Sequence, residues 1–230
     1  MKLLITSSTK FEVENIAIFL NIDISDSQNF WTTEFLNNNI SILITGIGTF
    51  QTMYNLLENL QENEYDFILN IGICGSFSKS LPIGAVVNIT EEQFGDFGIN
   101  NNGKFISMFD TKFIDRNIPP FSDGKLINKS YQNKIKLDDN IKKVKSITVN
   151  TASGEEKQIN KLIKIYNVEV ENMEGASFFY VCMKKNIPFL EIRSISNLVE
   201  PRNNENWQIM TAVSKLTDAL KIIIFELIKK

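Results

Sequence analysis

Short apolar segments alternate with longer segments of helical periodicity along most of the chain. The apolar segments predict strands at Leu3–Thr6, Ile40–Thr45, Phe67–Ile71, Ala85–Thr90, Ser146–Val149, Val168–Glu171 and Phe189–Ile195. The helical spacing predicts helices at about Phe11–Leu20, Met53–Leu60, Glu174–Asn186 and Glu205–Lys230. This alternation predicts an α/β fold with a mixed or mostly parallel central β-sheet flanked by helices.

The segment 100–145 carries the weakest pattern. Asn100–Gly103 and Pro119–Pro120 are typical of loops, so we predict little regular structure in this segment. Regularity returns after it, where Ser153 is followed three residues later by Glu156. This spacing is that of a capping box and predicts a helix that begins here and ends at about Tyr166.

Polar and glycine residues gather where the predicted strands end. In α/β folds, ligands bind beyond the carboxyl ends of the strands. Those ends carry Ser7–Glu12, Gly46–Gly48, Gly72–Ser76, Thr151–Glu155, Asn172–Glu174 and Ser196–Asn197. We therefore expect a ligand site to be assembled from these segments.

Length and charge narrow the choice of partner. The chain has 230 residues, which suits a single domain over residues 1–230. Lys and Arg number 24 against 27 Asp and Glu, a net charge of −3, so no basic excess exists for nucleic-acid binding. We find no leader pattern and no apolar run near the ~18 residues that span a bilayer. We expect a cytoplasmic protein without a membrane partner.

The composition also restricts the chemistry. The chain contains no histidine, which excludes Ser-His-Asp and Cys-His catalysis and histidine-based zinc sites. Its two cysteines, Cys74 and Cys182, are too few for an all-thiolate zinc site. We therefore expect no metal and no cofactor. Acid–base work would fall on carboxylates, amides, Lys, Tyr or the backbone.

Individual motifs leave alternatives open. Glu12 and Glu174 each stand where a strand gives way to a helix, and an acidic residue there is also favoured by the helix dipole alone. Gly46–Gly48 and Gly72–Gly75 suit close approach of a ligand to the backbone, or simple tight turns. Cys74 has no visible base beside it and fits a small buried residue better than a nucleophile.

Three segments together change this picture. They are GICG at 72–75, VENMEGA at 170–176 and RSISN at 193–197. In combination they resemble the purine nucleoside phosphorylase and methylthioadenosine/S-adenosylhomocysteine nucleosidase superfamily, over nearly the whole chain. The segment ISNLVEPRN at 195–203, with Trp207 beyond it, is similar to the futalosine hydrolases of that superfamily. These enzymes release hypoxanthine from futalosine on an alternative menaquinone pathway.

The resemblance implies a single-domain nucleoside phosphorylase-like fold and a small nucleoside substrate. It implies that Glu12 is the general base for water, that Glu174 binds the ribose hydroxyls and that Asn197 recognises the base. Met173 would pack against the sugar. Further substrate contacts are expected at Ile47, Gly72, Ile73, Ser153, Trp207 and Arg202, the last two for the benzoate end. Relatives are often dimers, so we also expect a homo-oligomer, a dimer or higher.

The attacking group is expected to be water. Phosphorylases of this superfamily bind phosphate through arginines near the first helix and on the strand before the GxxG turn. Here the first 25 residues and the strand Phe67–Ile71 contain no arginine. Lys10 is the nearby cation, and it also fits a solvated surface charge. A dianion would therefore bind poorly, and hydrolysis is favoured.

Asn197 favours a 6-oxopurine. Its amide can donate to a 6-oxo group and accept from a protonated N7, whereas a 6-amino group would face it donor to donor. Adenine-specific relatives carry Asp at this position, so a methylthioadenosine/S-adenosylhomocysteine nucleosidase is one alternative. A nucleoside-binding protein without catalysis is another, although it would not need both Glu12 and Glu174.

One departure from the superfamily concerns stacking on the base. No aromatic residue follows Ser153–Gly154–Glu155, where nucleosidases often place one. Phe94, Phe97 and Phe105 could replace it, but each fits the core better. Arg193 is expected to have a structural role in connecting loops.

Overall fold

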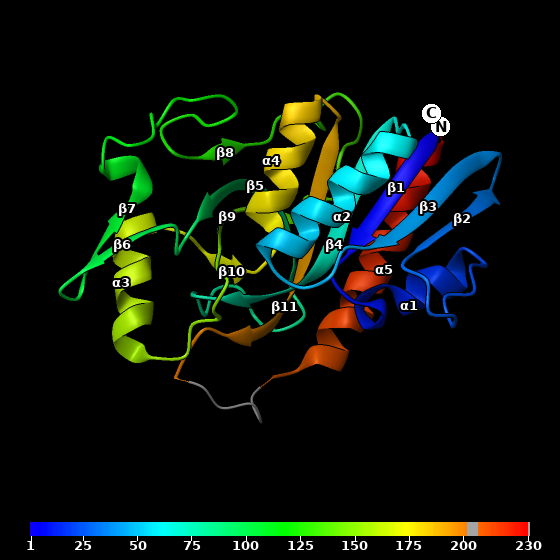
Figure 1. The fold of residues 1–230 in the computed structure, drawn as a ribbon. Coiled ribbons are helices and arrows are strands. Elements are labelled where there is room, and N and C mark those ends of the chain that lie inside the picture. Colours follow the sequence, from blue (N-terminus) through cyan, green and yellow to red (C-terminus); the bar gives the residue numbers. More distant parts are fainter. Residues whose placement is uncertain (202–206, 230) are drawn as a thin grey trace.

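The computed structural model describes residues 1–201 and 207–229. Strands and α-helices alternate towards both ends of the chain, while β4 to β9 follow one another with only a 3-10 turn among them (Figure 1). The strands are β1 (Lys2–Ser7), β2 (Phe30–Phe35), β3 (Asn38–Ile44), β4 (Phe67–Ser76), β5 (Val86–Phe94), β6 (Gly98–Asn101), β7 (Lys104–Ser107), β8 (Leu126–Ile127), β9 (Lys142–Thr148), β10 (Val170–Asn172) and β11 (Phe189–Leu198). The helices are α1 (Lys10–Phe19), α2 (Thr49–Glu62), the 3-10 turn η1 (Met108–Asp110), α3 (Glu156–Tyr166), α4 (Gly175–Lys185) and α5 (Ile209–Ile228).

The central sheet is mixed and partly closed. Its strand order is β10-β9-β5-β11-β4-β1-β3-β2, with β8 beside β5. Strands β3, β1, β4 and β11 are parallel, while β5 is antiparallel to β11 and β2 to β3. Strand β10 pairs with both β9 and β4, so β4, β11, β5, β9 and β10 form a closed ring. This closure places Glu171 of β10 beside Gly75 of β4.

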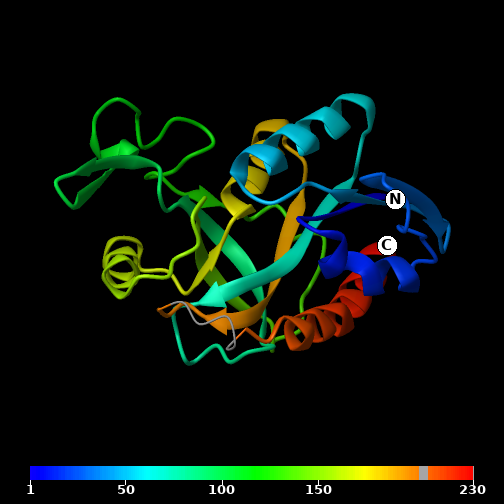
Figure 2. The ribbon, with the colours of Figure 1, turned by 60° about the horizontal axis from the view of Figure 1, so that its bottom comes forward.

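Helices cover the two faces of the sheet, with α2 and α4 on one side and α1 and α5 on the other (Figures 1 and 2). Strand β1 explains the arrangement, because neighbouring side chains of a strand point to opposite faces. Leu3 and Ile5 join the core with α1 and α5, while Leu4 joins the core with α2 and α4. All three side chains are fully buried.

The structure confirms the predicted fold class and extends several elements. Strands β4 and β11 continue beyond Ile71 and Ile195, and these extensions carry the residues that face the cavity described below. Strand β2 was not predicted. The segment 100–145 contains more structure than we expected, since β7, η1, β8 and the start of β9 lie within it.

The predicted capping box at Ser153 is wrong. Helix α3 begins at Glu156, with Glu155 as its N-cap and no side-chain cap. Ser153 instead donates its backbone N–H and its hydroxyl to the Glu171 carboxylate of β10. A buried acceptor on a neighbouring strand thus holds the serine that we expected to begin the helix.

Across the described residues, each helix is too short or too polar to cross a bilayer.

Candidate active site

A cavity of about 400 Å³ lies at the carboxyl ends of β1, β4 and β11, beside β10. Parallel strands bring these ends to one edge of the sheet, where we expected a ligand site. The described lining residues are Ser8, Thr9, Phe11, Glu12, Ile47, Ile73, Cys74, Gly75, Ala152, Ser153, Glu171, Asn172, Met173, Glu174, Ser196, Asn197, Val199, Trp207 and Ile209. Its walls are largely apolar, with a few convergent polar groups, as in small-molecule sites.

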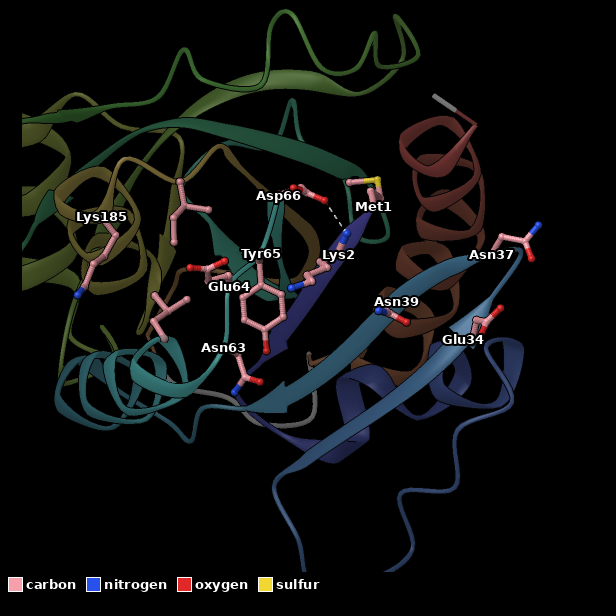
Figure 3. A pocket seen from close by; sticks show the side chains of 12 residues that line it. Met1, Lys2, Glu34, Asn37, Asn39, Asn63, Glu64, Tyr65, Asp66 and Lys185 are labelled. Carbon is pink, nitrogen blue, oxygen red and sulfur yellow. Dashed lines mark hydrogen bonds between the residues drawn. The ribbon is translucent and has the colours of Figure 1, made fainter.

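A larger hollow of about 740 Å³ lies near the amino end of β1 (Figure 3). Charged side chains of both signs line it, among them Lys2, Glu64, Asp66 and Lys185. The Asp66 carboxylate already accepts the backbone N–H of Lys2 at 2.7 Å. None of the described residues that we predicted for the site lines this hollow. The smaller cavity is therefore the better candidate for the active site.

Glu12 is fixed at the cavity wall by donors from two directions. Its Oε2 accepts from the hydroxyls of Ser8 at 2.5 Å and Thr9 at 2.9 Å, and from the Thr9 N–H at 3.1 Å. Its Oε1 accepts the Ile73 N–H of β4 at 3.0 Å. A carboxylate oxygen has two lone pairs, so Oε1 keeps one for a further donor.

Glu174 is the N-cap of α4 and faces the same cavity. Its Oε1 accepts the Gly48 N–H at 3.0 Å. Gly48 has a φ of +91°, a conformation that a side chain would strain, so glycine is needed to present this N–H. Burial raises the pKa of Glu174, while Arg193 and the Gly48 hydrogen bond oppose that rise.

Arg193 lies directly behind these two acids. It is fully buried, its Nη2 is 3.9 Å from Glu174 Oε2, and its Nε is 2.9 Å from Glu191 Oε1. A Cβ at Gly72 would meet Arg193 Nη1 at 2.0 Å and Glu12 Oε1 at 2.8 Å. Both atoms therefore lie over Gly72. We expected Arg193 to connect loops, but the structure places it within the charged cluster under the cavity.

The Asn197 amide has a defined orientation. Its Nδ2 donates to the Leu198 carbonyl at 2.9 Å, and its Oδ1 lies 2.7 Å from the Ser196 hydroxyl. A carbonyl can only accept, so the Leu198 contact fixes which end of the amide is the NH2. The second N–H and the second lone pair of Oδ1 remain for a ligand.

A third carboxylate, Glu171, lines the cavity wall near Asn197. In the sheet, Glu171 pairs with Gly75 of β4, and Gly75 pairs with Asn197 of β11. Burial raises the pKa of Glu171, and its bonds from Ser153 oppose this. Sequence reasoning missed Glu171. The alternation of Val168–Glu171 predicted a strand but gave no sign that the ring would close on β4.

Most other predicted residues line the cavity, namely Ile47, Met173, Ile73, Ser153 and Trp207. Gly72 does not. Its missing side chain makes room for Arg193 and Glu12 instead of a ligand, which corrects our expectation. Arg202 lies outside the described residues.

Aromatic residues around the cavity differ from those we considered. Phe94 and Phe97 pack against each other, with centroids 6.2 Å apart, and with Phe105 they are absent from the cavity lining. Phe11 and Trp207 line it instead. We did not predict Phe11 as a site residue, because in the sequence it is only an apolar residue near the start of helix α1.

The described lining contains three carboxylates and no lysine or arginine. Within the described residues, no cluster of three or more potential metal ligands occurs. Cys74 and Cys182 are buried and unpaired, and burial raises the pKa of each thiol. A thiolate nucleophile is disfavoured by this environment. The cavity therefore offers carboxylate and amide chemistry.

Known proteins are similar to this chain over most of its length. The family model described as "Phosphorylase superfamily" matches residues 2–229. The futalosine hydrolase of Thermus thermophilus is 23% identical over 194 residues, which are 80% of each chain. A 5'-methylthioadenosine/S-adenosylhomocysteine nucleosidase of Buchnera aphidicola is 24% identical over 200 residues, 84% of this chain and 76% of that one. A solved futalosine hydrolase mutant of Helicobacter pylori has a TM-score of 0.80 at 18% identity and covers 99% of this chain and 100% of that one.

Proposed function

The chain belongs to the phosphorylase superfamily, and from this premise and the cavity we propose that it is a nucleosidase that hydrolyses futalosine to hypoxanthine and dehypoxanthine futalosine. Relatives in both similar groups are named hydrolases or nucleosidases, which supports hydrolysis of an N-glycosidic bond.

The two buried acids support catalysis at the sugar. Cleavage of the bond between C1′ and the purine builds positive charge on the ribose, and nearby anions stabilise it. Glu174 would accept hydrogen bonds from the ribose hydroxyls. Glu12 would take a proton from the attacking water as the water oxygen bonds to C1′ and the purine leaves. The free lone pair of Glu12 Oε1 suits that task.

Water is a better nucleophile here than phosphate. Three carboxylates and no described cation line the cavity, so a phosphate dianion would meet repulsion without a compensating guanidinium. Arg193 lies behind the wall, where Glu191 already neutralises it. We therefore expect turnover that needs no phosphate.

The Asn197 amide supports a 6-oxopurine. With its NH2 end fixed by the Leu198 carbonyl, the second N–H can donate to O6 while Oδ1 accepts from protonated N7. A 6-amino group would place donor against donor, which costs about 1–3 kcal/mol for a buried pair. This observation carries the choice of hypoxanthine over adenine.

A second candidate is a methylthioadenosine/S-adenosylhomocysteine nucleosidase. Phe11, Val199 and Ile209 give part of the cavity an apolar wall that would suit a neutral 5′ substituent. In the described lining, no cation is available for the benzoate carboxylate of futalosine. Trp207 supplies an apolar face, and Arg202, our other candidate, is not described.

The test is to incubate the purified protein with futalosine, inosine and methylthioadenosine, with and without phosphate, and to identify the released base. We expect hypoxanthine from futalosine at a rate independent of phosphate. Faster release of adenine from methylthioadenosine would favour the second candidate. Binding without release of any base would indicate a nucleoside-binding protein.

A further inference from the structure

Strand β11 carries a buried ion pair that has no role in the reaction proposed above. Glu191 and Arg193 are two positions apart, so their side chains point to the same face of the strand. Both are fully buried, and Glu191 Oε1 lies 2.9 Å from Arg193 Nε. Burying two charges is costly, and apolar residues of similar volume would often serve stability as well. Stability alone therefore does not explain this ion pair.

The hydrogen bonds of the Arg193 guanidinium leave its Nη2 without a partner. Its Nε is bound to Glu191, and its Nη1 donates to the Ile71 carbonyl at 3.3 Å. These two bonds fix the plane of the group. Its Nη2 is buried, has no hydrogen-bond partner, and lies 3.9 Å from Glu174 Oε2. The second oxygen of Glu191, Oε2, is also buried without a partner.

Without its contact to Glu191, Arg193 would be able to pair with another nearby acid. A guanidinium and a carboxylate form a strong bidentate pair when their geometry permits it. Glu174 and Glu12 are the acids next to Arg193, and both are already placed to meet the substrate. If the guanidinium turned to pair fully with Glu174, the oxygens that should accept the ribose hydroxyls would be occupied.

We infer that Glu191 is a positioning residue that holds Arg193 behind the cavity and keeps it from pairing fully with Glu174 or Glu12. This inference rests on the proposed nucleosidase function and assigns a role to a residue that contacts no substrate. Glu191 thereby preserves both the open oxygens of the two acids and the charge balance of the cluster.

The charges in this cluster determine the expected pH behaviour. Arg193 faces Glu191, Glu174 and Glu12, and Glu191 also faces Glu92 of β5. Burial raises the pKa of Glu92 to about 8, so it is largely neutral near pH 7. Removing the Glu191 charge would leave Arg193 less neutralised, and Arg193 would then lower the pKa of Glu174 more strongly.

The test is Glu191→Gln, assayed with whichever nucleoside the wild type hydrolyses. The amide oxygen can still accept from Nε, so the fold has a partner for Arg193, but the anchoring charge is lost. We expect kcat to fall roughly 10- to 100-fold, the scale of a misplaced catalytic group. We expect the acid limb of kcat/KM to move to lower pH. Glu226→Gln, which removes an exposed carboxylate paired with Lys229, should change neither.

A double-mutant cycle with Arg193→Gln separates positioning from simple structural support. If Glu191 acts through Arg193, adding Glu191→Gln to Arg193→Gln should cost little further kcat. If Glu191→Gln does not fold, Glu191→Asp replaces it. That variant keeps the charge but withdraws the oxygen, so kcat should fall while the acid limb stays in place.

Two results would overturn the inference. A folded Glu191→Gln enzyme with the kcat and pH profile of the wild type would reject it alone. The inference would also be rejected if the losses of kcat from Glu191→Gln and Arg193→Gln multiplied in the double mutant. A wild type that hydrolyses no nucleoside would instead reject the proposed function, and the inference with it.

Discussion

At the scale of single residues, Glu12 and Glu174 lie in different environments. Glu12 is held by hydroxyls and backbone N–H groups, which leave one oxygen able to meet a water molecule. Glu174 has one backbone donor and a buried guanidinium nearby, and burial raises its pKa. The surroundings therefore support a base at Glu12 and a sugar-binding anion at Glu174.

Glu12→Gln tests the base. The amide keeps the size of the side chain but cannot take a proton from water, so turnover should fall by about 10²-fold or more while nucleoside binding persists. Single-turnover kinetics and calorimetric titration would measure the two quantities. The matched control is Glu14→Gln, an exposed residue of the same helix, which should behave as wild type. Undiminished turnover of Glu12→Gln would exclude Glu12 as the base.

Asn197→Asp tests recognition of the purine. A carboxylate next to the Leu198 carbonyl must rotate or take up a proton, and it then suits a 6-amino group better than a 6-oxo group. We expect the ratio of kcat/KM for 6-oxo over 6-amino nucleosides to fall by about 10-fold or more. Competing substrates in one reaction, with the released bases separated, give this ratio directly. An unchanged ratio would exclude the proposed role of Asn197.

At the scale of elements, the start of helix α4 depends on Asn172. Its Oδ1 accepts the N–H groups of Glu174 at 3.0 Å and Gly175 at 2.7 Å. Its Nδ2 donates to Glu92 at 2.6 Å and to Ser146 at 2.9 Å. One buried amide therefore connects the helix that carries Glu174 to strands β5 and β9.

Asn172→Ala should lose both the side-chain acceptor at the start of α4 and the buried partner of Glu92. Loss of a side-chain acceptor for the first N–H groups of a helix costs about 1 kcal/mol, and an unsatisfied buried group adds about 1–3 kcal/mol. We expect urea denaturation to show a loss within that combined range, together with a lower kcat because Glu174 moves. Glu155→Ala at the start of α3 is the control, since that N-cap makes no side-chain bond. A loss no larger than the control's would refute this account of Asn172.

The sequence allowed the elements and the acids to be predicted, but not the contacts that cross the sheet. Apolar periodicity located β1, β4 and β11, and the helices α1 and α5 that follow β1 and β11, because burial on both faces leaves a strong local pattern. Glu12 and Glu174 were identifiable from motifs at strand ends. Strand β2 and the charged pair in β11 were not, since an edge strand has a weaker pattern and a buried charge is explained only by its distant partners.

At the scale of the whole molecule, the closed ring of β4, β11, β5, β9 and β10 encloses carboxyl groups that most cores exclude. Glu92 is fully buried, with Asn172 at 2.6 Å and Thr148 at 2.8 Å. Burial raises its pKa from 4.5 to about 8, and the nearby charge of Glu191 adds to the rise. At neutral pH the folded protein therefore retains a proton that the unfolded chain has released.

This proton makes stability depend on pH. Between pH 4.5 and about 8 the folded state binds more protons at Glu92 than the unfolded state, so the free energy of unfolding falls as pH rises. One proton corresponds to at most about 1.4 kcal/mol per pH unit. Glu171, Glu174 and Glu191 also have raised pKa values and act in the same direction.

Glu92→Gln isolates the contribution of Glu92. The amide oxygen can accept from Asn172 as Oε1 of Glu92 does. The NH2 group can donate to the Thr148 hydroxyl, whose own proton then goes to Asn172 Oδ1 instead of to Oε2 of residue 92, so the variant should fold. We expect it to be close to wild type near pH 5 and more stable at pH 8, which gives a shallower slope in urea denaturation from pH 5 to 8. Parallel slopes for the two proteins would mean that Glu92 ionises alike in the folded and unfolded states. The closed ring would then admit enough water to solvate its charge.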